Sequence, residues 1–103
     1  MNTLPDCFGN EVRLTEERLA HILEHPEMSG MATEIPRVLR HPQLVRRSRS
    51  DTTVRLFYEF YARTVLGGKW LSVVVKYAET DAFVVTAYLT ENPKAGEDLW
   101  PKK

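Results

Sequence analysis

KWLSVVVKYAETDAFVVTAYLT, residues 69–90, decides the fold class of this chain. Two runs rich in β-branched and aromatic residues flank the polar segment 78–81, and residue types alternate along each run. Such alternation is typical of β-strands, and a short polar connection between two of them is typical of a hairpin. We therefore predict antiparallel strands at 69–77 and 82–90.

The same pattern continues upstream and predicts further strands at about 43–49 and 53–64. The connections 50–52 and 65–68 are short, so successive strands are expected to pair antiparallel as a meander. Residues after 92 are polar apart from Leu99 and Trp100, which we expect to fold back onto the body.

Helical patterning is confined to the first 40 residues, after a short extended stretch at 11–14. One helix is expected from about 16 to 25, with Thr15 placed to cap it, and a second from Thr33 to about Arg40. We therefore predict an α+β fold in which two N-terminal helices pack on one face of a four-stranded antiparallel meander sheet. The chain, residues 1–103, is expected to form a single domain.

The composition of the chain excludes some classes of protein. The formal net charge is zero, which argues against a protein that coats nucleic acid by bulk attraction. A single cysteine cannot form an internal disulfide, and no apolar run has the length of a membrane span or the pattern of a signal peptide. We therefore expect a cytoplasmic protein with no membrane association.

The charge is unevenly distributed along the chain. Residues 1–36 carry two arginines and seven carboxylates, whereas residues 37–63 carry seven arginines and two carboxylates. Such a chain can present a basic patch to phosphate, or it can pack its two halves together and neutralise the field. Both interpretations stay open at this point.

Alternation along a strand sorts its side chains onto the two faces of the sheet. We expect the apolar sets to face the helices, and the mixed sets to share an open face without helices. The sets expected to face the helices are Val54, Leu56, Tyr58 and Phe60; Leu71, Val73, Val75 and Tyr77; and Phe83, Val85, Ala87 and Leu89. The residues expected on the open face are Arg47, Arg49, Arg55, Tyr61, Trp70, Ser72, Lys76, Thr86, Tyr88 and Thr90. This composition suits an RNA surface, and it is equally typical of a solvated sheet face.

His21 and His25 are spaced i, i+4 and therefore lie on one side of the first helix. Such a pair can share a metal, can supply a general acid or base, or can have a structural role near Pro26. A zinc site needs at least a third ligand, and neither Cys7 nor His41 has a recognisable ligand spacing to the pair. We therefore predict no metal site.

Several segments together carry a resemblance that covers most of the chain. They are Arg13-Leu14-Thr15, His21-Ile22-Leu23-Glu24-His25-Pro26-Glu27, Val73-Val74-Val75-Lys76, Val85-Thr86-Ala87-Tyr88-Leu89-Thr90 and Lys94-Ala95-Gly96-Glu97-Asp98-Leu99-Trp100. With these segments the chain resembles the phage-associated branch of the barnase–EndoU–colicin–RelE-like (BECR) nuclease superfamily. The resemblance implies a RelE-like fold, metal-independent RNA cleavage on the sheet and no cofactor. It also implies a toxin-like or phage and mobile-element origin, often with an inhibitory partner protein.

Metal-independent cleavage needs a base for the ribose 2′-hydroxyl, an acid for the leaving oxygen and cations for the developing charge. The candidate catalytic residues are His21, His25, Lys76, Arg55 and Tyr88. The candidate substrate-binding residues are Arg47, Ser48, Thr86, Thr90 and Tyr61. If the first helix covers the back of the sheet, its histidines and Lys76 need not share a site.

Two alternatives use the same predicted fold. The first is a non-catalytic RNA- or protein-binding module that uses the same face without cleavage. The second is an interaction protein in which the long strand 53–64 pairs edge to edge in a homodimer.

Overall fold

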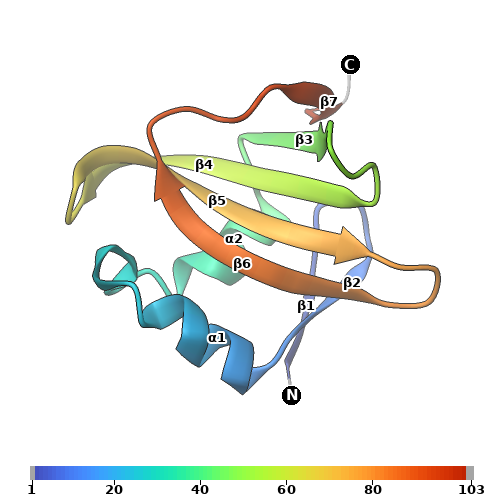
Figure 1. Ribbon diagram of the computed structural model, residues 1–103, viewed down its shortest axis with the longest axis horizontal. Helices are drawn as coiled ribbons and strands as arrows, with labels where there is room; N and C mark the ends of the chain where they lie inside the picture. Colours follow the sequence, from blue (N-terminus) through green and yellow to red (C-terminus); the bar gives the residue numbers. More distant parts are fainter. Residues whose placement is uncertain (1, 102–103) are drawn as a thin grey trace.

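The computed structural model describes residues 2–101 and contains one sheet, two α-helices and one 3₁₀-helix (Figure 1). The helices are α1 (Glu16–Leu23), η1 (Pro26–Met28) and α2 (Glu34–Arg40). The strands are β1 (Asn2–Pro5), β2 (Glu11–Leu14), β3 (Leu44–Ser48), β4 (Val54–Thr64), β5 (Gly67–Tyr77), β6 (Ala82–Thr90) and β7 (Gly96–Trp100). The predicted domain 1–103 includes residues 1, 102 and 103, which lie outside the described residues.

The predicted four-stranded antiparallel sheet with two packed helices is wrong as a description of the fold. The sheet has seven strands in the order β1-β2-β6-β5-β4-β3-β7, and it is mixed because β2 pairs parallel with β6. The predicted meander forms its middle, and its strands pair antiparallel. The three added strands have four or five residues each, too few to produce the alternation on which the prediction relied.

Both predicted helices are present, slightly shorter than expected. The Thr15 hydroxyl accepts a hydrogen bond from Arg18 N at 3.0 Å and so caps α1, while Glu16 and Glu17 in the first turn suit the helix dipole. Pro36 lies in the first turn of α2, where it removes no helical hydrogen bond.

The core lies between the helices and one face of the sheet. The helix α1 packs against β6, and α2 packs against β1, β4 and β5. The fully buried side chains here include Val12, Ile22, Met28, Ile35, Val38, Leu39, Val45, Phe57, Leu71, Val73 and Val75. Burial of this apolar surface is the main favourable contribution to folding.

The strand register corrects two of the predicted face assignments. In β4, Phe57 pairs with Val73 and faces the helices, so Leu56 and Tyr58 face the other way, opposite to prediction. In β6, a bulge separates Val84 from Thr86, so Ala82 and Val84 are buried in place of Phe83 and Val85. An extra residue in one strand moves the side chains on one side of the bulge to the opposite face of the sheet. The alternation of residue types in the sequence does not reveal this shift.

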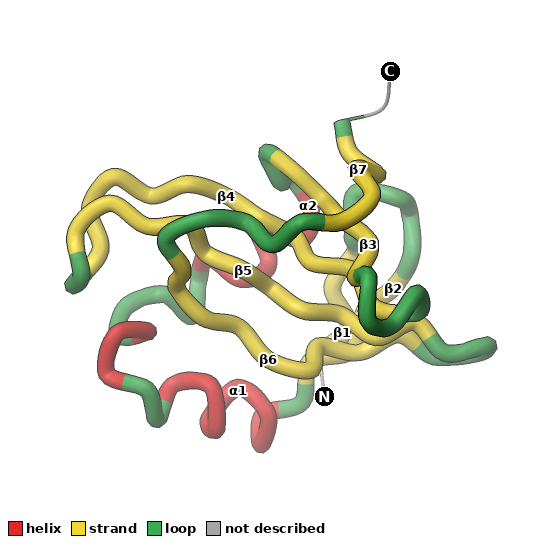
Figure 2. Tube along the Cα trace, turned by 45° about the horizontal axis from the view of Figure 1, so that its top comes forward, coloured by secondary structure: helices red, strands yellow, loops and turns green. Residues whose placement is uncertain are grey.

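The sheet face away from the helices, called the open face, is partly covered by residues 91–95 (Figure 2). This segment, called the strap, runs from β6 to β7 and must cross β5, β4 and β3, which lie between them. Lys94 N donates to the Tyr58 hydroxyl at 3.1 Å, and Arg46 donates to the carbonyl of Lys94 at 2.9 Å. These contacts explain how Tyr58 is buried on a face that carries no helix.

Within residues 2–101, none of the helices has both the length and the apolar character needed to cross a membrane.

Candidate functional site

A hollow of about 400 Å³ lies on the open face, between the β3–β4 loop and the strap. Its floor comes from β4, β5 and β6, and its two sides come from the loop and from Lys94 and Ala95. It is lined by Ser48, Arg49, Ser50, Asp51, Val54, Leu56, Val74, Thr86, Tyr88, Lys94 and Ala95. Three predicted substrate-contacting or catalytic residues, Ser48, Thr86 and Tyr88, therefore meet around one hollow.

The register of the strands explains this meeting. Thr86 pairs with Val74, and Tyr88 pairs with Ser72, so these side chains share the face on which the sequence predicted them. On β3, Arg47 pairs with Arg55 and faces the helix side, which turns Ser48 to the open face. In the part of the chain that the structure describes, the hydroxyls of Thr86 and Tyr88 form no hydrogen bond to a protein group.

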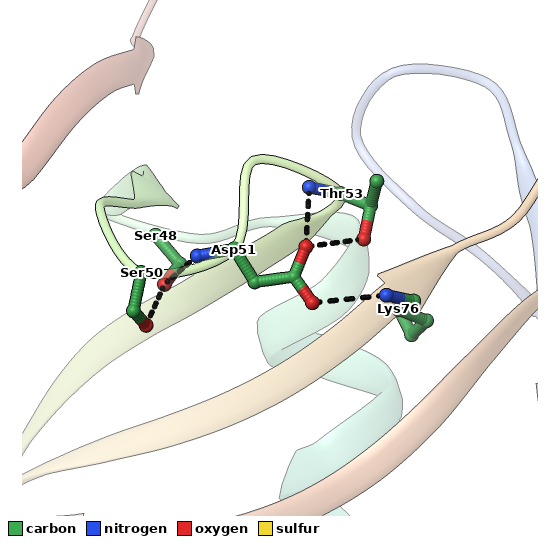
Figure 3. A network of polar contacts seen from close by, with 5 residues as sticks. All are labelled: Ser48, Ser50, Asp51, Thr53 and Lys76. Carbon is green, nitrogen blue, oxygen red and sulfur yellow. Dashed lines mark hydrogen bonds and ion pairs between the residues drawn. The ribbon is translucent and has the colours of Figure 1, made fainter.

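Figure 3 shows the polar network that fixes the β3–β4 loop beside the hollow. One carboxylate oxygen of Asp51 accepts from the backbone and hydroxyl of Thr53, at 3.0 and 2.6 Å, and the other accepts from Lys76 Nζ at 2.9 Å. These hydrogen bonds, that from the Thr53 hydroxyl foremost, lower the pKa of Asp51 to about 2. Lys76 is therefore ion-paired with Asp51, a residue that lines the hollow, but Lys76 itself does not line it.

The cations that line the hollow itself are Arg49 and Lys94. Both are exposed, and across residues 2–101 neither forms an ion pair. Lys94 and Asp51 were not among the predicted site residues. Asp51 carries a recognisable signal, because Asp followed by Thr in a short loop favours a side-chain-to-backbone turn. Lys94 carries none, because only the path of the strap brings it here.

The two histidines lie elsewhere. His21 and His25 are on and just after α1, on the helix side of the sheet, with side chains 63% and 61% exposed. Each lies near a carboxylate of its own segment, His21 Nδ1 at 3.8 Å from Glu24 and His25 Nδ1 at 3.7 Å from Glu27. Lys76 lies on the open face, so the histidines and Lys76 are on opposite sides of the sheet in this structure.

Arg55 and Tyr61 also lie on the helix side, so the prediction that they share the open face is wrong. The Tyr61 hydroxyl donates to Glu34 on α2 at 2.7 Å, and burial together with this carboxylate raises the pKa of Tyr61. The guanidinium of Arg55 lies over two aromatic rings, 4.8 Å from the centre of Phe8 and 4.3 Å from that of Tyr77. Both misplacements follow from the inverted face assignment of β4.

The remaining predicted residues are occupied by other contacts. The prediction that Arg47 lies on the open face is wrong: it lies on the helix side, where its Nη1 is 3.2 Å from a carboxylate oxygen of Glu97 on β7. Thr90 is on the open face, opposite Trp70, but its hydroxyl donates to the carbonyl of Asn92 at 3.2 Å, outside the hollow. Ser72 is fully buried, and no group within residues 2–101 forms a hydrogen bond with its hydroxyl.

A second hollow of about 460 Å³ lies at the turn between β5 and β6. It contains none of the predicted site residues, and its one cation, Arg13, is 2.7 Å from the carboxylate of Asp81. This pairing leaves the second hollow without a free positive charge. Among residues 2–101, no three His, Cys, Asp or Glu side chains are grouped so that they could hold a metal ion.

No family model, no curated protein and no solved structure matches this chain.

Proposed function

We propose that the protein binds single-stranded RNA and seats one backbone phosphate in the open-face hollow. The observation that carries this proposal is the convergence of three chain segments on one hollow. The strands contribute the hydroxyls of Thr86 and Tyr88, the β3–β4 loop contributes Arg49, and the strap contributes Lys94. Phosphate oxygens in protein complexes are contacted by these groups, namely arginine and lysine cations and serine, threonine and tyrosine hydroxyls.

Single-stranded RNA fits this surface better than duplex RNA. The hollow is flanked by Tyr88, and the exposed aromatic residue Phe60 lies farther along the same face, in an edge contact with Trp70 at 5.6 Å. Unpaired bases stack on aromatic side chains, whereas paired bases in a helix leave no face free for them.

Metal-independent RNA cleavage is the second candidate function. It is favoured by the presence of Lys76 and Tyr88 on the same face, since lysine and tyrosine can act as proton donors or acceptors. Lys76 lies four residues along β5 from Ser72, the partner of Tyr88, which is a separation of roughly 13 Å along the strand. Because the acid and base in cleavage must flank one phosphodiester, this spacing makes binding the leading proposal.

Further properties of the protein are proposed without support from the fold. A toxin-like or phage-related origin and control by an inhibitory protein rest on the sequence resemblance alone. A cytoplasmic location rests on the single cysteine, which cannot form an internal disulfide. Homodimer formation stays a prediction that light scattering tests.

Anisotropy of a labelled single-stranded RNA, measured against salt concentration in excess chelator, tests the binding proposal. We expect Arg49→Gln combined with Lys94→Gln to weaken binding and to reduce the slope of log affinity against log salt by roughly one or two. Arg63→Gln removes an exposed cation of β4 that does not line the hollow, so it serves as the matched control. Equal affinity of the double variant and the wild type would exclude the hollow as the RNA site.

The same preparation tests cleavage. Incubation of mixed cellular RNA with wild type, Lys76→Ala and His21→Ala in excess chelator separates the two functions. A binding module leaves the RNA intact. Cleavage that is lost in Lys76→Ala but kept in His21→Ala would establish a nuclease that works without the histidine. Cleavage lost in His21→Ala would contradict the separation of the two residues described above.

A further inference from the structure

Arg55 lies on the helix side of the sheet, where β4 and β5 pass the loop that joins β1 to β2. Its guanidinium lies over the rings of Phe8 and Tyr77, with distances of 4.8 and 4.3 Å to the ring centres. Contacts of this kind use the flat faces of the guanidinium and leave the N–H donors at its edge available. The side chain is partly exposed, so these donors are accessible from solvent.

The two rings that hold Arg55 are themselves fixed. Phe8 makes edge contacts with Phe57 and Trp100, with ring centres 6.1 and 5.8 Å apart. The Tyr77 hydroxyl donates to the buried carboxylate of Asp6 at 2.6 Å. The guanidinium is therefore positioned before any ligand arrives, which reduces the conformational entropy lost on binding.

Arg55 has no acidic partner among residues 2–101, unlike three of the other strand arginines. Arg13, Arg46 and Arg47 each form an ion pair, with Asp81, Asp98 and Glu97 respectively. For Arg55 the described residues supply neither an ion pair nor a hydrogen-bond acceptor. Five N–H donors in a planar fork match the oxygen atoms of a phosphate or a carboxylate.

Besides Arg55, the charged groups nearby are Arg47, which is paired with Glu97, Arg40 and the carboxylate of Asp6. Arg47 is its register partner on β3, on the same face, and the charges of Arg40 and Arg55 both act on Cys7. The nearby carboxylate, Asp6, is buried and accepts four hydrogen bonds, from Phe8 N, Asn10 N, Asn10 Nδ2 and the Tyr77 hydroxyl. Its oxygens are thus engaged within the loop. Burial and Asp6 raise the pKa of Cys7 to about 11, so the thiol adds no negative charge near neutral pH.

We propose that Arg55 anchors a phosphate-binding site on the helix side of the sheet, with Arg40 adding to the positive field. A phosphate monoester carries a charge of about −1.5 to −2 at neutral pH, and its oxygens match the planar fork of donors on an unpaired arginine. The site is on the opposite face from the open-face hollow, and it does not rest on the proposed RNA function. The phosphate can belong to a free phosphomonoester or to an RNA backbone.

Titration of the isotope-labelled protein with inorganic phosphate, followed by NMR at constant ionic strength, tests the site. We expect saturable shifts of the Arg55 side-chain N–H signals and of the backbone around Phe8. Arg55→Lys keeps the charge but loses the planar fork, so it should bind phosphate roughly tenfold more weakly or worse. Arg63→Lys, the same change at an exposed arginine of β4, should bind as the wild type does.

Arg40→Gln changes an exposed residue of α2 and provides a second variant if Arg55→Lys does not fold. We expect it to weaken phosphate binding a few-fold. Absence of saturation in the wild type up to tens of millimolar phosphate would overturn the proposal. Equal affinity in Arg55→Lys and wild type would overturn it as well.

Competition separates the two sources of phosphate. Adenosine monophosphate offers a phosphomonoester, whereas a short RNA with hydroxyl ends offers only diesters. Displacement of phosphate by the nucleotide alone assigns the site to a free phosphomonoester, and displacement by the RNA assigns it to the backbone. The double variant Arg49→Gln, Lys94→Gln should keep phosphate binding at Arg55. Loss of RNA binding at the hollow and loss of phosphate binding at Arg55 can therefore be told apart.

Discussion

Asp51 is a surface carboxylate that organises a loop through hydrogen bonds from two directions. Thr53 binds one of its oxygens from within the loop, and Lys76 binds the other from β5. The pKa of Asp51 falls from an ordinary value of 3.8 to about 2 in the folded chain. A carboxyl group whose pKa is lower in the folded state stabilises the fold at any pH above its unfolded value.

This linkage gives a prediction for the acid range. The stabilisation from Asp51 should be complete above about pH 4 and should disappear as the pH falls through about 2. Asp51→Asn should therefore show a shallower loss of stability across that window than the wild type does. Urea midpoints measured at several pH values provide the check. Glu79→Gln, which removes an exposed carboxylate without an ion pair in residues 2–101, is the control and should follow the wild-type curve.

Tyr77 gives a second prediction at the same scale. Tyr77→Phe removes one of the four hydrogen bonds to Asp6, a carboxylate only 1% exposed. Loss of a donor to a buried charged acceptor should lower the free energy of unfolding by about 1–3 kcal/mol. Tyr88→Phe is the matched control, because its hydroxyl is not bonded to any described residue, and it should change stability by less than about 0.5 kcal/mol. Equal effects of the two variants would show that the Asp6 network contributes no stability.

For single candidate residues, the sheet face was predictable when the residue lies within a regular strand. Lys76 was placed on the correct face because the apolar residues of β5 mark its inner side, and Thr86 and Tyr88 were placed correctly because they follow the bulge in β6. Arg49 and Lys94 reach the hollow from a loop and from the strap. No periodic pattern extends into such segments, so the sequence carried no signal for the position of Lys94.

At the scale of the element, β4 shows where alternation fails. Both of its faces are apolar, since Phe57 meets the helices while Leu56 and Tyr58 lie beneath the strap and loops. Prediction from alternation assumes that the more apolar set of side chains faces the helices. This assumption fails in β4, because the strap and loops bury apolar side chains on the other face as well. The error in β4 is the direct cause of the wrong positions predicted for Arg55 and Tyr61.

The pairing of β3 with β7 gives an element-scale prediction. A Cβ atom at Gly96 would lie against the backbone carbonyl of Arg47, which has little freedom to move within the sheet. Gly96→Ala should therefore displace β7 or destabilise the fold by about 1–3 kcal/mol. Glu97→Ala, the next residue of the same strand, removes only an exposed ion pair and should cost less than about 1 kcal/mol. Thermal unfolding of both variants measures these two losses of stability.

At the scale of the whole molecule, no ion pair within residues 2–101 joins the acidic segment 1–36 to the basic segment 37–63. Arg46 and Arg47 in the basic segment pair with Asp98 and Glu97 from the C-terminal part of the chain, not with the acidic residues 1–36. Arg49 and Arg55 stay unpaired within residues 2–101, on opposite faces of the sheet. These two arginines are the centres of the two phosphate sites proposed above.

Removal of residues 96–103 gives a prediction for the complete fold. The truncated chain lacks β7, so β3 loses its outer partner and the strap loses its anchor at Arg46 and Asp98. It also loses Trp100, which packs against Phe8. We expect lower stability, exposure of Tyr58 and association through the free edge of β3. Intrinsic fluorescence and light scattering at several protein concentrations measure these changes.

The place of β7 in the sheet has a consequence for synthesis of the chain on the ribosome. The strand β3 is made about 50 residues before the strand that covers its outer edge, because Ser48 pairs with Gly96. During that interval the nascent polypeptide carries an unprotected edge beside the growing meander. Unpaired strand edges that are exposed during folding make a chain prone to aggregation. Slower translation between residues 48 and 96 should therefore prolong the time in which newly made copies expose this edge.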